Sequence, residues 1–109
     1  MDTIRILLVD DHQVVREGLR RMLELEPDFD IVGEAGIAKD VLDQTEILSP
    51  EIILMDIKMS DIDGIELTRQ LKEKSPTTNV IMLTLYDEYL PQAIEAGARG
   101  YLTKDISRE

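Results

Sequence analysis

Short apolar runs alternate along the chain with longer stretches in which apolar residues recur every three or four positions. The short runs resemble strands that are covered on both faces, and the longer stretches have the spacing of amphipathic helices. The expected strands are residues 4–9, 30–35, 52–55, 79–84 and 100–102. The expected helices are residues 12–25, 39–48, the segment from Gly64 to Ser75-Pro76, and residues 89–96, which Gly97 closes as a C-cap.

This alternation predicts an α/β fold, a doubly wound five-stranded parallel sheet with helices on both faces and right-handed crossovers. The chain has 109 residues, 43% of them apolar and 32% charged, which suits one globular domain with a single core. In such folds, ligands bind outside the carboxyl ends of the strands. We therefore look for functional residues where the predicted strands end.

The composition excludes several kinds of functional site and partner. There is no cysteine, which excludes disulfides and thiolate sites, and the single histidine cannot form a multi-histidine metal site alone. The net charge of −11 disfavours direct nucleic-acid binding, but it is compatible with a metal cation or a basic partner. No stretch is apolar enough to span a bilayer and no signal-peptide pattern is present, so we expect a cytoplasmic location and no membrane association.

Polar residues with complementary chemistry follow the predicted strands. Asp10 and Asp11 follow the first strand, Asp56 the third, Thr84 ends the fourth, and Lys104 comes soon after the fifth. Three clustered carboxylates repel one another unless a cation shares the site, and oxygen ligands favour Mg²⁺. An aspartate beside Mg²⁺ can act as a nucleophile towards phosphorus, while a hydroxyl and an ammonium contact the phosphoryl oxygens. The pattern predicts an aspartyl-phosphate site.

Five segments, in this order along the chain, resemble the response-regulator receiver domain of two-component signalling, especially its NarL/FixJ-type branch. The segments are Leu8–His12, Leu54–Met59, Asp63-Gly64, Leu83-Thr84 and Ala96–Lys104. The resemblance covers essentially the whole chain. It implies a flavodoxin-like (CheY-like) fold with strand order 2-1-3-4-5.

The resemblance also implies residue roles and partners. Phosphorylation by a sensor histidine kinase, with Mg²⁺ bound, would switch a surface that controls dimerisation or a DNA-binding output domain. The chain would be no enzyme beyond slow self-phosphorylation and autodephosphorylation. The implied roles are Asp56 as phosphoacceptor; Asp11 as direct metal ligand, with Asp10 acting largely through water; the backbone carbonyl of Lys58 as a further ligand; Thr84 and Tyr101 as switch pair; and Lys104 as the phosphate-contacting lysine.

The chain departs from the family pattern on the expected output side. The loop after Thr84 is shorter than usual, Leu85 is larger than the residue often found there, and Ser60 replaces a common proline. The sequence stops at Glu109, where a fifth helix would begin. We expect residues 1–109 to be a receiver domain that lacks its fifth helix and any output domain. A dimer or a swapped segment that takes the place of the fifth helix is a less favoured explanation of this length.

Other interpretations remain open. A phosphohydrolase with an aspartate nucleophile would usually carry a second carboxylate shortly after it, whereas position 58 is Lys. A phosphorylation-independent interaction domain would not need the five polar residues at the strand ends. A flavin-binding domain is disfavoured because no phosphate-cradling loop follows the first strand.

Several single residues also have simpler interpretations. Asp10-Asp11 alone could merely cap a helix. His12 is expected to be a helix-start residue, and Asp61 and Asp63 exposed loop residues, with Gly64 supplying a turn.

Overall fold

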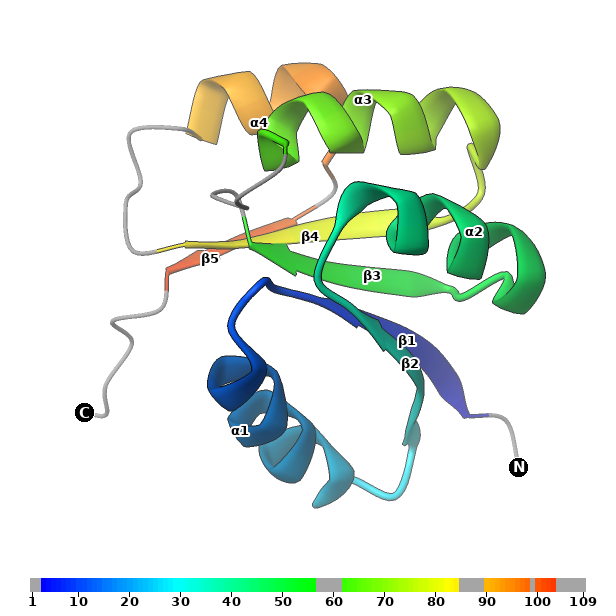
Figure 1. The fold of residues 1–109 in the computed structure, drawn as a ribbon, viewed down its shortest axis with the longest axis vertical. Helices are drawn as coiled ribbons and strands as arrows, with labels where there is room; N and C mark the ends of the chain where they lie inside the picture. The colour runs from blue at the N-terminus through cyan, green and yellow to red at the C-terminus, as the bar shows by residue number, and fades with distance from the viewer. Residues whose placement is uncertain (1–2, 57–61, 85–89, 99, 104–109) are drawn as a thin grey trace.

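The computed structural model describes residues 3–56, 62–84, 90–98 and 100–103, with the backbone alone for residues 84, 90, 93 and 100–103. The elements alternate as the hydrophobic pattern predicted (Figure 1). The strands are β1 (Ile4–Val9), β2 (Phe29–Ala35), β3 (Ile52–Asp56), β4 (Asn79–Thr84) and β5 (Gly100–Thr103). The helices are α1 (Gln13–Glu24), α2 (Ala38–Leu48), α3 (Gly64–Lys74) and α4 (Leu90–Ala96).

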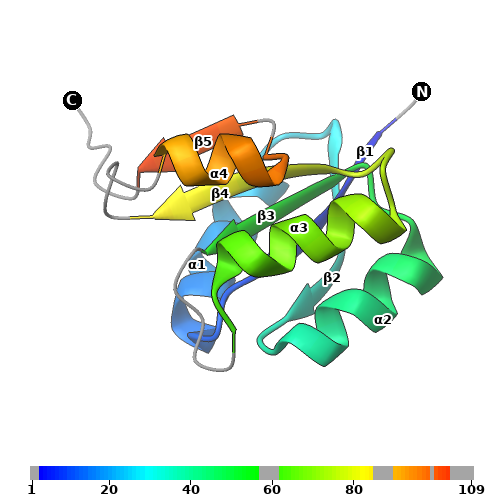
Figure 2. The ribbon, with the colours of Figure 1, turned by 90° about the horizontal axis from the view of Figure 1, so that it is seen from above.

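The five strands form one parallel sheet in the order β2-β1-β3-β4-β5. This confirms the predicted doubly wound fold and its strand order. Helix α1 covers one face of the sheet, and α2, α3 and α4 cover the other (Figures 1 and 2).

The side chains of β1 alternate between two apolar clusters, because successive strand residues point to opposite faces. Leu7 and Val9 belong to the larger cluster, on the side of α2, α3 and α4. Ile6 and Leu8 belong to the smaller one, against which α1 packs Leu19 and Leu23. The strand is therefore covered on both faces, as its nearly continuous apolar sequence predicted.

Helix α1 is less buried than the three helices on the other face of the sheet. No residue of α1 is buried, although its apolar spacing resembles that of a core helix. Met22, which fits that spacing, is 63% exposed. Apolar spacing shows which helix positions share a face, but only packing against other elements decides how deeply that face is covered.

The start of α3 differs from expectation in one respect. Asp63 is exposed, as predicted, but it is also the N-cap of α3, and its carboxylate accepts a hydrogen bond from Ile65 N at 2.8 Å. Gly64 is the first residue of the helix, as the sequence predicted. An aspartate at the N-cap satisfies a backbone N–H that has no partner within the helix.

The glycine predicted to close α4 does so. Gly97 has φ of +112°, a region that side chains rarely adopt, and its N–H donates to the carbonyl of Ile94 at 3.0 Å. Within the described ranges, none of the helices combines the length and the apolar character needed to cross a bilayer.

Strand register fixes where the polar residues meet. Val9 of β1 pairs with Met55 of β3, so Asp10 and Asp56 are the next residues at the same edge of the sheet. Because both strands are parallel and adjacent, their following side chains emerge side by side.

Candidate functional site

An acidic cluster lies at the carboxyl ends of β1 and β3. Asp10, Asp11, His12 and Asp56 each offer a ligand atom, and these four atoms all lie within 4.8 Å of one another. Asp10 is only 1% exposed and Asp56 only 6%. The structure thus brings together the three carboxylates that sequence reasoning selected. Buried carboxylates at this separation favour a shared cation.

Asp10 is held by its backbone as well as by its side chain. Its N–H donates to the carbonyl of Ala35 on β2 at 3.1 Å. Its carboxylate Oδ1 accepts from the backbone N–H of His12 at 2.9 Å and lies 3.2 Å from Nδ1 of that imidazole. The carboxylate therefore tightens the turn that leads from β1 into α1, so its proposed metal-site role and a local structural role coexist.

Asp11 presents the oxygen that most clearly fits a cation. Its Oδ1 is buried and has no hydrogen-bond partner in the described part of the chain. Nδ1 of His12 lies 2.9 Å from that oxygen without hydrogen-bond geometry. A buried carboxylate oxygen without a hydrogen bond is costly, and a hard divalent ion would satisfy it. The oxygen-rich donor set therefore fits Mg²⁺.

His12 is the N-cap of α1, which confirms its predicted place at a helix start. Sequence reasoning missed that its imidazole turns back towards Asp10 and Asp11. The ring is 68% exposed, so it lies at the open side of the cluster. The available sequence signal was its position directly after the two aspartates.

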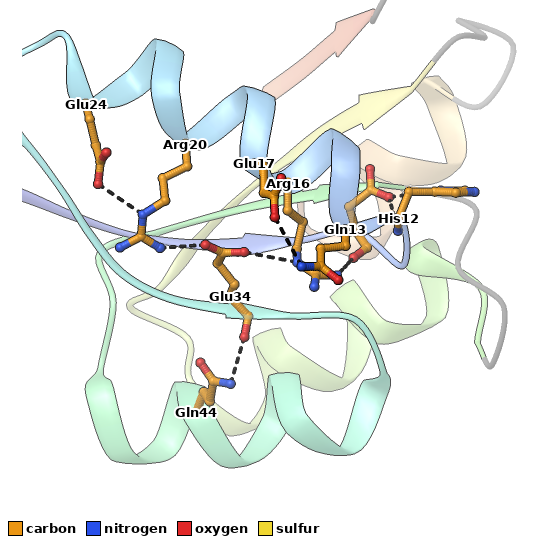
Figure 3. Close-up of polar contacts among 9 residues, drawn as sticks. His12, Gln13, Arg16, Glu17, Arg20, Glu24, Glu34 and Gln44 are labelled. Carbon is orange, nitrogen blue, oxygen red and sulfur yellow. Dashed lines mark hydrogen bonds and ion pairs between the residues drawn. The ribbon is translucent and has the colours of Figure 1, made fainter.

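Next to the acidic cluster, a network of charged side chains joins α1 to β2 (Figure 3). Glu34 of β2 accepts from Arg16 Nε at 3.2 Å and from Arg20 Nη1 at 2.5 Å. Arg20 also pairs with Glu24, and Gln44 of α2 donates to the carbonyl of Glu34 at 2.9 Å. Sequence patterns could not assign these pairs, because most join residues that are distant along the chain.

The network shifts the ionisation of its members. Burial alone would raise the pKa of Glu34, but hydrogen bonds from Arg20 and Arg16 outweigh it and lower that pKa. The hydrogen bond to Glu34, aided by Glu24, raises the pKa of Arg20. Glu34 and Arg20 therefore stabilise each other's ionised forms.

The remaining predicted residues are only partly placed. The backbone of Thr84 ends β4 opposite Thr103, and the backbone of Tyr101 pairs with Met82. Lys58 and Lys104 lie outside the described residues, as do Ser60, Asp61, Leu85 and residues 86–88 of the short loop.

A pocket of about 340 Å³ opens between α2 and α3, lined in part by Leu42, Glu46, Leu71 and Lys74. None of the residues in the acidic cluster lines it. It is therefore a separate surface feature.

Comparison with known proteins decides the family. A model of the response regulator receiver domain matches residues 6–109. The chain belongs to this family. The receiver is 43% identical to the transcriptional regulatory protein YdfI of Bacillus subtilis, over 96% of this chain and 50% of that protein. It is 41% identical to the DNA-binding transcriptional activator DevR/DosR of Mycobacterium tuberculosis, over 94% of this chain and 48% of the relative.

Solved structures agree with this assignment. The crystal structure of a LuxR-family two-component response regulator from Aurantimonas sp. SI85-9A1 matches with a TM-score of 0.91 and 37% identity, over 95% of this receiver and 76% of that chain. The response regulator domain of Thermotoga maritima CheB matches with a TM-score of 0.87 and 32% identity, over 96% of this receiver and 83% of that chain. These relatives are signalling regulators of the NarL/LuxR type and its wider family, as the sequence segments predicted. The receiver spans about half the length of the curated relatives it matches.

Proposed function

We propose that this receiver accepts a phosphoryl group from a sensor histidine kinase onto Asp56, with Mg²⁺ held by Asp10, Asp11 and Asp56. The observation that carries the proposal is the convergence of these three carboxylates at one sheet edge in a member of the receiver family. A phosphorylation-independent interaction domain would not need to bury Asp10 and Asp56 next to each other, so their burial disfavours that alternative.

The roles within the metal site follow from burial. Asp11 offers a buried oxygen that has no hydrogen bond among the described residues, and it is proposed as a direct ligand. Asp10, whose carboxylate already accepts from His12, would act largely through water. The backbone carbonyl of Lys58 is proposed as a further ligand. The ion would neutralise the carboxylates and the phosphoryl oxygens.

In the proposed transfer, an Asp56 carboxylate oxygen attacks the phosphorus of a phosphohistidine. The new O–P bond forms as the N–P bond breaks, and the electron pair of the broken bond stays on the leaving imidazole nitrogen. The Thr84 hydroxyl would donate to one phosphoryl oxygen and Lys104 would pair with another. Both contacts strengthen as charge develops on those oxygens.

Phosphorylation adds negative charge and acceptor oxygens at the end of β3. Thr84 moving towards the phosphoryl group, with Tyr101 turning inward, would bias the receiver between two surface states. That surface would govern homodimerisation or a DNA-binding output domain elsewhere in a longer protein, in keeping with the transcriptional names of the relatives. Family membership also supports a cytoplasmic location for the receiver.

Acetyl phosphate with Mg²⁺ provides the direct test. We expect intact mass to show one phosphoryl group per chain, stable in acid and labile in base. The adduct should not form when a chelator removes Mg²⁺, and it should be absent in Asp56→Asn. Asp30→Asn, an exposed aspartate on β2, serves as the matched control and should be phosphorylated like the wild type. Rapid multiple turnover of phosphomonoesters without an adduct would favour the phosphohydrolase instead. Unchanged partner binding in Asp56→Asn, with and without phosphodonor, would favour the phosphorylation-independent domain.

A further inference from the structure

We propose that Arg16 is a positioning residue for the metal site, holding the turn that carries Asp10 and Asp11 in the geometry that Mg²⁺ needs. This inference rests on the proposed function, because it concerns the same carboxylates. Arg16 would contact no metal and no phosphoryl group. It would act through the backbone of Asp10.

The turn needs such support because it lies beyond the sheet. The ladder of β1 ends at Val9, which pairs with Ala35 on one side and Met55 on the other. Asp10 keeps one backbone bond to Ala35, and after it the chain leaves both neighbouring strands. The direction of the following residue, Asp11, then depends on how the peptide after Asp10 is oriented.

Arg16 fixes that peptide. Its Nη1 donates to the carbonyl oxygen of Asp10 at 2.5 Å. The backbone N–H of Arg16 also donates to the carbonyl of His12 at 3.1 Å, which anchors the arginine in the first turn of α1. The side chain thus closes a loop from α1 back to the end of β1.

The guanidinium of Arg16 is itself held by Glu34 of β2. Its Nε donates to Glu34 Oε1 at 3.2 Å, and its side chain is only 17% exposed (Figure 3). Arg20 holds the other carboxylate oxygen of Glu34. Two donors of one planar group therefore bridge β2 and the Asp10 carbonyl, which a lysine ammonium on a flexible stem does not reproduce.

The surrounding backbone is shaped around the same contact. A Cβ on Gly36 would lie 3.0 Å from Arg16 Nη1 and 3.4 Å from the carbonyl oxygen of Asp10. Glycine at this position leaves room for the guanidinium against the turn. This observation concerns a residue outside the ion-pair network and points to the same contact.

A positioning role and a purely electrostatic role predict opposite results. If Arg16 only added positive charge near the cluster, removing it would strengthen cation binding. If it positions the turn, removing it weakens binding, since groups that orient metal ligands typically contribute about 10–100-fold in affinity. The sign of the change therefore separates the two.

The experiment is Mg²⁺ titration by isothermal calorimetry on the whole chain at a temperature where each variant is folded. We expect Arg16→Met to weaken Mg²⁺ binding by about ten-fold. Arg16→Lys keeps the charge, but its Mg²⁺ affinity should fall by a similar factor, because the bridge between Glu34 and the Asp10 carbonyl is lost. Arg21→Met, the same charge change at an exposed position of α1, should stay within about two-fold of the wild type, since exposed charges are screened. Equal or tighter binding in Arg16→Met, or full affinity in Arg16→Lys, would overturn the proposal.

A second variant covers the case in which Arg16→Met does not fold, which thermal unfolding in chelator would reveal. Gly36→Ala leaves every charge in place and should also weaken Mg²⁺ binding, while unchanged affinity there would count against the positioning role. Failure of the proposed function looks different. In that case the wild type itself would neither bind Mg²⁺ nor gain a phosphoryl group on Asp56.

Discussion

Asp56 of β3 pairs with Leu83 of β4, which places Thr84 one residue beyond the level of Asp56 on the neighbouring strand. Tyr101 lies one strand further out, paired with Met82. A phosphoryl group on Asp56 would extend in the direction in which the strands end, towards the level of Thr84. The sheet register thus supports the proposed contact between the phosphoryl group and Thr84.

Thr84→Ala should slow phosphorylation of Asp56 by acetyl phosphate by about ten-fold or more, because a hydrogen bond to a developing oxyanion is lost. Mg²⁺ affinity should not change, since Thr84 is not a proposed ligand. Thr84→Ser keeps the hydroxyl and should restore most of the rate, measured by intact mass over time at saturating Mg²⁺. A Thr84→Ser rate as low as that of Thr84→Ala would show that the hydroxyl is not the contributing group.

Asp11→Asn should stabilise the metal-free fold while removing its response to Mg²⁺. Three carboxylates repel one another when no cation is bound, so removing one charge should raise the free energy of unfolding in chelator by about 1 kcal/mol. Mg²⁺ at the proposed site would stabilise the wild type by binding the folded state alone, and this gain should largely disappear in the variant. Thermal unfolding at one fixed pH, with chelator and with Mg²⁺, measures both effects. Asp30→Asn should leave the Mg²⁺-induced rise in Tm intact, and a full rise in Asp11→Asn would contradict the metal-ligand role.

Two glycines should respond in opposite ways to the same substitution. Gly97→Ala should lower the free energy of unfolding by about 1–3 kcal/mol, because its φ of +112° is strained for alanine and its Cβ would lie 2.6 Å from Lys72 Cγ. Gly18→Ala, inside α1, should raise this free energy by about 0.5–1 kcal/mol, because, apart from its own helix backbone and its chain neighbours, no atom of the described residues lies within 4 Å of the new Cβ. Urea unfolding of both variants provides the comparison. Equal effects of the same sign would contradict the assigned backbone conformations.

Glu34 should make stability depend on pH in the acid range. Its pKa is lower in the folded protein, so its stabilising contribution is present above its unfolded-state pKa and is lost as the pH falls through the folded pKa. The difference in unfolding free energy between the wild type and Glu34→Gln should therefore be largest near neutral pH and shrink below about pH 4.5. Urea unfolding across this range measures the difference, with Glu73→Gln as an exposed control. A difference that grows on acidification would contradict the ion pairs with Arg16 and Arg20.

The order of elements was predictable from the sequence because each local pattern agrees with the global fold. Nearly continuous apolar runs define β1, β3 and β4, and the polar residue after each run marks a strand end. In parallel sheets, strand ends share one edge, so Asp10, Asp11 and Asp56 could be grouped from chain order alone. Their convergence confirms that reasoning, while their roles in metal binding and phosphorylation remain predictions.

The structure adds to the sequence reasoning where a residue's role depends on its neighbours in space. Met22 fits the helical spacing of α1, yet it is exposed and does not join the smaller apolar cluster. Asp63 was expected to be a loop residue, but the direction in which the chain enters α3 makes it a cap.

The sequence by itself therefore determined the α/β fold, the strand ends and the acidic residues placed there, because periodicity and chain order are local properties. Only the tertiary structure decided which groups support those residues. The bridge from Glu34 through Arg16 to the carbonyl of Asp10 joins β2, α1 and the end of β1. Such a contact depends on strand register and helix placement, which no local pattern specifies.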